Sequence, residues 1–458
     1  MKINTYLDKV RKYVSSIFYP ISLGVLTFLI WLLPMPFTYI FSAIYTFLAF
    51  LPLFSEDGRA YTALLIFPII TQSENISLTS IKGYSMMMVI GTVLSVILYL
   101  FIHKKEFVRG NLLIPLVVMI FIFLISYFIH GVMSKSIEKT GLLFLVFLLI
   151  QCLVYSLLCT MLGKGDTFPY LCKSIVCFSL TVSMEIFVFF IRNGFEIAPV
   201  HFSLGWSYTI QSASSLLCMT LPFYGILIYS KKWAWIFGEL FVLVSILLLS
   251  TDSALLSLLF AFIPLILLSF RSYGKLYSYI SLIMIVAIGI TLVSLILTNG
   301  SFARRLLDTL SSLNLFHQPE GLRKEQFETS MELFLSSPVI GTSISSFSNI
   351  NHTLSFSGNT ILTIAVLGGG IGLAAFLAYE ITLYVSTMKN DNPDKWIYLV
   401  FLLMLEMIGL IDNTIFNLGI LQLLLVSHAC FEMTNRQEDV IVHDDFYRYY
   451  RKKPGSLT

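Results

Sequence analysis

Residues 276–298 read LYSYISLIMIVAIGITLVSLILT, and residues 299–324 continue as NGSFARRLLDTLSSLNLFHQPEGLRK. The first stretch carries no charge over a length that crosses a hydrocarbon core of about 30 Å as one helix. The second opens a polar interval, 299–357, in a chain otherwise built of long apolar runs. This contrast predicts an all-α membrane protein with one long loop outside the lipid.

The composition supports a membrane protein. The 458 residues are 57% hydrophobic and 12% charged, with a mean hydropathy of +0.85. Soluble domains have about 25% charged residues, so an ordinary soluble domain is excluded. Because lipid cannot hydrogen-bond to open backbone groups, we expect a polytopic transmembrane helical bundle of about 12 to 14 spans. The spans are expected near residues 15–34, 36–54, 60–76, 83–102, 112–130, 141–162, 169–192, 209–229, 233–249, 252–270, 276–298, 358–386, 395–411 and 414–432.

The positions of lysine and arginine predict the orientation. With a cytoplasmic N-terminus, 21 of the 29 Lys and Arg residues fall on the inner side of the membrane and eight on the outer side. This bias follows the positive-inside rule, so both termini are predicted to be cytoplasmic and the long loop external. The chain then divides into transmembrane helices in 1–298, the external loop 299–357, C-terminal transmembrane helices in 358–432 and a cytoplasmic tail, 433–458.

Several functional classes lack support in the sequence. The six cysteines fall within predicted spans and form no CxxC pair or zinc knuckle. There is no P-loop, dinucleotide fingerprint or HExxH pattern, so we expect neither a metal nor another cofactor. The net charge of +3 gives no support for nucleic-acid binding.

Helical projection predicts two short helices in the external loop. In 302–313 the leucines gather on one side and Arg304 points away, as in a helix lying on the membrane surface. In the second helix, 321–336, Arg323 shares the protein-facing stripe, and its charged neighbours face water. The stripe contains Arg323, Phe327, Met331 and Phe334, whereas Lys324, Glu325, Glu328 and Glu332 lie on the water-facing side.

An arginine that faces the protein at a membrane surface needs a partner, because burying an unpaired charge is costly. For Arg323 the partner is either an outer-side carboxylate, such as Glu138 or Glu196, or the phosphate of a substrate, which fits the arginine fork. The residues alone leave both alternatives open.

The order of motifs around this loop resembles the O-antigen ligase and polymerase-like family of bacterial membrane glycosyltransferases. The family has an arginine, a helix with aromatic residues, a Pro-x-x-Gly turn, a His-Asn pair and a glycine-rich span. The corresponding segments here are Arg323 to Phe334, Ser337-Pro338-Val339-Ile340-Gly341-Thr342-Ser343, Gly358-Asn359-Thr360, Gly368-Gly369-Gly370, the earlier Leu204-Gly205-Trp206-Ser207 and Ser250-Thr251-Asp252-Ser253.

The resemblance spans roughly residues 200–380, and this chain departs from it at two positions. Gly358 stands where the family has histidine, and Ala254 stands where it has arginine. The nearest external histidine is His352, six residues before Gly358.

The resemblance implies a metal-independent polymerase of capsular or surface polysaccharide. The donor would be a polyprenyl-diphosphate-linked oligosaccharide on the external face of the cytoplasmic membrane. An O-antigen-type ligase is its near relative. Membrane lipids and other polysaccharide-assembly proteins are the expected partners.

The leaving diphosphate needs preorganised cations, and the acceptor hydroxyl needs a general base. Arg323 is expected to bind the diphosphate, and His352 is the candidate base. Arg304, Arg305 and Arg192 are further candidates for substrate binding, although each also suits a lipid headgroup. Asn359 is expected either to cap the next helix or to orient the substrate. His317 fits a turn residue, and His201 is an alternative base.

Four glutamates inside predicted spans favour a rival hypothesis, a polyprenyl-glycan flippase or other transporter, because intramembrane carboxyls often mark ion or proton paths. They are Glu185, Glu239, Glu380 and Glu406. We place Glu380 near the cytoplasmic end of its span and Glu406 nearer the outer end. No internal repeat supports the rival. We interpret Gly368-Gly369-Gly370 as close helix packing.

Overall fold

The computed structural model describes residues 2–34, 36–70, 83–134, 139–162, 167–192, 210–229, 234–249, 258, 322–344, 359–390, 392, 394–410 and 413–435. Every regular element in these ranges is helical. Six described helical segments are long and apolar enough to cross a membrane. The protein is therefore a helical, multi-pass membrane protein, and the larger span count stays a prediction.

The elements are α1 Lys2–Val14, α2 Phe18–Leu32, α3 Phe37–Ala49, η1 Leu51–Phe54, α4 Ala60–Ile70, α5 Gly83–His103, α6 Leu113–Ser134, α7 Lys139–Met161, α8 Thr167–Arg192, α9 Ile210–Tyr229, α10 Ala234–Leu249, α14 Leu322–Ser336, α15 Thr360–Lys389, α16 Lys395–Gly409 and α17 Leu418–Asn435. Each expected span that falls on described residues coincides with a helix. The expected spans at 252–270 and 276–298 and the surface helix at 302–313 lie outside the described residues.

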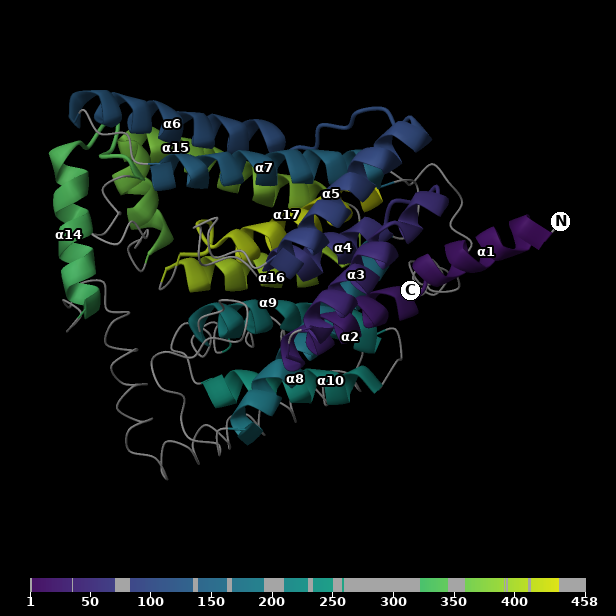
Figure 1. Cartoon of the computed structure of the whole chain (residues 1–458). Helices are drawn as coiled ribbons and strands as arrows, with labels where there is room; N and C mark the ends of the chain where they lie inside the picture. Colours follow the sequence, from purple (N-terminus) through teal and green to yellow (C-terminus); the bar gives the residue numbers. More distant parts are fainter. Residues whose placement is uncertain are drawn as a thin grey trace, which may run out of the picture.

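Helices from both ends of the chain interleave in one bundle. α6 packs on α15, α4 and α7 pack on α17, and α9 packs on α16. Figure 1 shows α6, α7 and α15 along one side, α4, α16 and α17 in the middle, and α8, α9 and α10 on the other side. At one end of the bundle α14 runs across the other helices, and α1 extends from the opposite end.

The expected span at 60–76 contains a helix that is enclosed by protein. All residues of α4 from Ala60 to Phe67 are buried, and α4 packs against α2, α5, α8 and α17. From Ala60 to Phe67, α4 is therefore surrounded by protein and presents little surface to lipid.

The charged stretch before the first expected span forms a helix that we did not predict. α1 is bent by 68° relative to α2. Val14 is buried and Val10 is partly buried, whereas Lys9 and Lys12 are exposed. The Arg11 Nε donates a hydrogen bond to the Phe54 carbonyl over 2.9 Å. α1 is therefore an amphipathic helix docked on the end of the bundle.

The outer surface of the bundle carries large apolar side chains. Phe101 is 76% exposed on α5, Phe121 60% on α6 and Phe237 77% on α10. So many exposed large apolar side chains are unusual for a soluble monomer, and here they form the face available to lipid.

Candidate functional site

α15 is a long helix with a break at Gly369. This residue has φ 60° and ψ −153°, a combination that essentially only glycine adopts. A break inside a membrane helix frees backbone groups, and these need other partners because lipid offers none. The surroundings of Gly369 therefore decide whether the break is open to a ligand or filled by protein.

The partners come from Ser337–Ile344, here called the clamp segment, which follows α14. The Gly370 N–H donates to the Pro338 carbonyl over 2.8 Å. The Thr342 N–H donates to the Val366 carbonyl over 2.7 Å. The clamp segment thus fills the break with its own backbone and leaves these groups satisfied.

Two glycines make this contact possible. A Cβ on Gly369 would lie 2.4 Å from the Val339 carbonyl, and one on Gly341, whose φ is 82°, would lie 2.5 Å from the Val366 oxygen. A Cβ on Gly370 would meet nothing closer than 3.5 Å. Close helix packing was predicted for Gly368, Gly369 and Gly370. It is confirmed for Gly368, where an added Cβ would lie 3.0 Å from the Phe123 ring of α6, whereas the partner of Gly369 is the clamp segment.

The clamp segment thereby joins the Pro-x-x-Gly turn to the glycine-rich span, two motifs that the sequence presents separately. The clamp segment also holds α14 against α15, and these two helices are in contact. Ser330 of α14 is buried at 3% exposure, and Leu333 and Phe334 pack on the hydrophobic core.

The predicted orientation of α14 is partly correct. Glu328 and Glu332 are exposed and Phe334 is partly buried, as expected. Phe327 was predicted to face the protein, but it is 44% exposed. Ser330 is the first buried residue among the described side chains of α14, and Phe327 lies outside the contact with the bundle.

Asn359 caps α15. Its Oδ1 accepts a hydrogen bond from the Leu362 N–H over 3.0 Å, and its Nδ2 donates to the Leu410 carbonyl over 3.0 Å. The next residue, Thr360, accepts a hydrogen bond from the Thr414 N–H over 3.0 Å. The capping role is therefore observed, and Asn359 also fixes the start of α15 to the end of α16. Its role in substrate binding stays a prediction.

The remaining candidate residues are placed unevenly. Arg192 is the last residue of α8 and is exposed. Arg323 lies in the first turn of α14, seven residues before the buried Ser330. Three others, Arg304, Arg305 and His352, lie outside the described residues, as do His201, His317, Glu138 and Glu196.

A buried carboxyl network that we did not predict lies within the helical bundle. Glu432 of α17 is 6% exposed. One of its oxygens accepts hydrogen bonds from the Tyr155 hydroxyl over 2.6 Å and from the Asn111 N–H over 3.0 Å. The Tyr155 hydroxyl in turn accepts from the Leu112 N–H over 3.3 Å. The network ties the start of α6 to α7 and α17.

His428 extends this polar core one turn along α17. Its Nε2 lies 3.2 Å from the Ser386 hydroxyl of α15, and its Nδ1 lies 3.4 Å from the Tyr398 hydroxyl of α16. The ring is fully buried, and both nitrogens are engaged. This geometry suits a structural connection between three helices better than a catalytic base, which needs access to a substrate.

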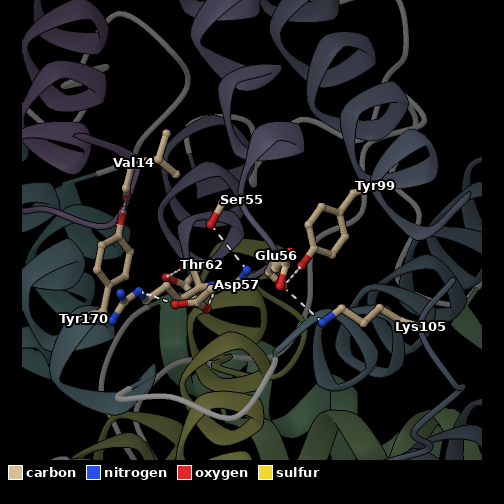
Figure 2. A network of polar contacts seen from close by, with 9 residues as sticks. Val14, Ser55, Glu56, Asp57, Thr62, Tyr99, Lys105 and Tyr170 are labelled. Atoms are coloured by element: carbon tan, nitrogen blue, oxygen red, sulfur yellow. Dashed lines mark hydrogen bonds and ion pairs between the residues drawn. The ribbon is translucent and has the colours of Figure 1, made fainter. Parts of the chain in front are cut away.

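A second network fixes the connection between η1 and α4 (Figure 2). Asp57 and Arg59 form an ion pair, and Arg59 lies over the ring of Tyr170. The Glu56 carbonyl accepts hydrogen bonds from the Tyr99 hydroxyl over 2.7 Å and from the Lys105 Nζ over 3.0 Å. The network joins α5 and α8 to this connection.

The turn between α15 and α16 is also buried and polar. The Asn390 side chain donates to the Phe431 carbonyl over 2.9 Å, and the Asp394 N–H donates to the Asn392 side chain over 2.9 Å. Burial raises the pKa of the Asp394 carboxyl to about 6.

Within the described ranges, no three His, Cys, Asp or Glu side chains gather as they would around a metal ion. No family model and no curated protein matches this chain.

Proposed function

We propose that this protein is a polysaccharide polymerase that joins polyprenyl-diphosphate-linked oligosaccharides on the external face of the cytoplasmic membrane. The observation that carries the proposal is the clamp segment, whose backbone bonds to α15 at Gly370 and Val366. It gives the arginine-bearing helix α14 a fixed support at the end of a membrane bundle. It also unites the two motifs on which the family resemblance rests.

The placement of Arg323 supports diphosphate binding. Seven residues are close to two helical turns, so Arg323 and the buried Ser330 share one face of α14. A guanidinium on this face would lie at the membrane boundary, where the diphosphate of a polyprenyl carrier also lies. Its planar fork matches phosphate oxygens. Arg192, Arg304 and Arg305 would supply further positive charge.

The proposed reaction is a glycosyl transfer. The acceptor hydroxyl oxygen attacks the anomeric carbon of the donor, the bond from that carbon to the diphosphate oxygen breaks, and the polyprenyl diphosphate leaves with the electron pair. His352 accepts the hydroxyl proton. Arg323 stabilises the negative charge that develops on the leaving group, and this is the role that makes the proposed mechanism metal-independent.

The test compares Arg323→Ala with Lys324→Ala, its neighbour on the other side of α14, and with His352→Ala. Surface polysaccharide is resolved by chain length on a gel. We expect Arg323→Ala and His352→Ala to lose long chains while single repeat units are still displayed outside the cell, and Lys324→Ala to retain long chains. Unchanged chains in Arg323→Ala, at wild-type protein level, would remove the main site assignment.

The broken α15 favours a second candidate, a polyprenyl-glycan flippase or other transporter, because interrupted membrane helices often form transport sites. Against it, the clamp segment occupies the backbone groups that such a site would offer a substrate. The same experiment separates the candidates: lipid-linked units trapped inside the cell indicate a flippase. A ligase would leave long lipid-linked chains that lack their final acceptor.

A further inference from the structure

Glu380 of α15 and Glu406 of α16 are hydrogen-bonded to each other through their side chains. Carboxylates only accept hydrogen bonds, so this bond forms only when one of the two groups carries a proton. Apart from this contact, the Oε2 of Glu380 is buried without a hydrogen-bond partner among the described residues. These glutamates were expected at different depths of the membrane, but they are neighbours in the structure.

The pair lies deep in the predicted membrane region. Glu380 comes nine residues before the end of α15 at Lys389, and Glu406 comes eleven residues after the start of α16 at Lys395. At 1.5 Å per residue these positions are about 14 and 16 Å from the turn that joins the helices. That is roughly half the thickness of a hydrocarbon core.

The carboxyl groups border the lipid-facing surface. On α16, Glu406 lies between Leu403 and Leu410, which are 37% and 41% exposed. On α15, Ile381 next to Glu380 is 58% exposed. An unpaired carboxylate is costly at such a depth, and neither glutamate forms an ion pair with a described Lys, Arg or His.

An independent observation on α15 points to the same place. The hydroxyl of Tyr379 is fully buried, has no hydrogen-bond partner among the described residues, and interacts electrostatically with Glu380 and Glu406. Buried hydroxyls normally have a hydrogen-bond partner, so within the described part of the chain the Tyr379 hydroxyl is a free hydrogen-bonding group beside the glutamate pair.

The other titratable groups around the pair are uncharged side chains. Tyr384 on α15 interacts with both carboxyls. Tyr379 in turn interacts electrostatically with Cys152 of α7 and Tyr398 of α16. None of these supplies the positive charge that would stabilise two ionised glutamates.

We propose that Glu380 and Glu406 form a proton-binding site inside the membrane that holds one shared proton between α15 and α16. When the proton leaves, two like charges face each other in an apolar setting and push the helices apart. The site thus couples a proton to the packing of α15 on α16. It does not depend on the proposed polymerase activity.

The test uses dicyclohexylcarbodiimide, a lipid-soluble reagent, on membranes that contain the full chain. A protonated carboxyl adds its oxygen and its hydrogen across one C=N bond of the reagent, and the adduct rearranges to a stable N-acylurea. Mass spectrometry of peptides then locates the label. We expect one label per chain at Glu380 or Glu406, declining by at least about fivefold between pH 6 and pH 10.

The variants make the assignment specific. Glu380→Gln should leave the label on Glu406, Glu406→Gln should leave it on Glu380, and the double variant should lose it at both positions. Glu332→Gln, which changes an exposed glutamate of α14, should label like the wild type. A folded protein that is unlabelled at both glutamates would overturn the proposal, as would labelling that does not change with pH. Protection by sodium at constant pH would also overturn it, since the site would then bind a cation.

Discussion

Asp394 shows how burial of one residue makes stability depend on pH. It is 4% exposed in the turn between α15 and α16, and its pKa is raised to about 6. In the unfolded chain an aspartate titrates near its ordinary pKa of about 3.9. Between these two pKa values the folded state binds more protons than the unfolded state. The stability that the protein has below pH 4 is therefore lost as the pH rises through 6.

Replacing Asp394 by Asn should remove this pH dependence, because the amide does not ionise. Relative to Asp394→Asn, the wild type should lose stability between pH 4 and pH 7, by up to about 3 kcal/mol. Thermal unfolding in detergent across this range measures the difference. Asp8→Asn, at an exposed position on α1, should follow the wild-type profile. Parallel profiles for the wild type and Asp394→Asn would contradict the assignment.

Single residues were predictable where the signal is local. Asn359 stands directly before an apolar run, which is the usual position of a helix cap, and it caps α15. The pairing of Glu380 with Glu406 was not predictable, because it depends on the relative depth of two helices. The bond between Tyr155 and Glu432 joins residues 277 positions apart, and no local pattern encodes it.

At the scale of elements, the clamp segment and α15 depend on glycines that serve different purposes. Gly369 needs a backbone conformation closed to other residues, and its added Cβ would overlap the Val339 carbonyl. Gly370 is exposed, and its added Cβ would make only ordinary contacts. Replacing these two adjacent glycines by alanine should therefore affect the stability of the protein in opposite ways.

Gly369→Ala should destabilise the protein by at least about 2 kcal/mol, since backbone strain adds to steric overlap. Gly370→Ala should leave stability unchanged or raise it by up to about 1 kcal/mol, because alanine is the better helix former. Thermal unfolding of both purified variants in detergent provides the comparison. Equal losses in the two variants would show that the break at Gly369 does not require glycine.

Helix positions were predictable from apolar runs of membrane length, and those in the described ranges coincide with helices. The break in α15 was not predictable, because a glycine triplet in an apolar run also fits simple helix packing. α1 was missed although the spacing of its apolar residues, Val10 and Val14 among them, between charged ones is already amphipathic in the sequence.

For the whole molecule, the predicted topology places α14 outside the cell and the α5–α6 connection inside. All six native cysteines are buried, so they give little background in thiol labelling. Glu332→Cys and Glu106→Cys introduce one exposed thiol on each side. A membrane-impermeant maleimide on intact cells should label Glu332→Cys, and Glu106→Cys only after permeabilisation. The reverse pattern would invert the topology and place Arg323 in the cytoplasm.

Composition and the length of the apolar runs were sufficient to predict a helical membrane protein, because both reflect the solvent around the chain. They carry no information on which helices become neighbours. The contact of α4 with α17 and of α6 with α15 depends on side-chain fit across most of the sequence.

The bond between the Asn111 N–H and Glu432 spans 321 residues, and it constrains the order of biogenesis. α17, which lies in the middle of the bundle against α4, α7 and α8, leaves the ribosome after every other described helix. Until then these helices reside in the membrane without their central neighbour. The bundle therefore gains its central packing only once α17 has been inserted.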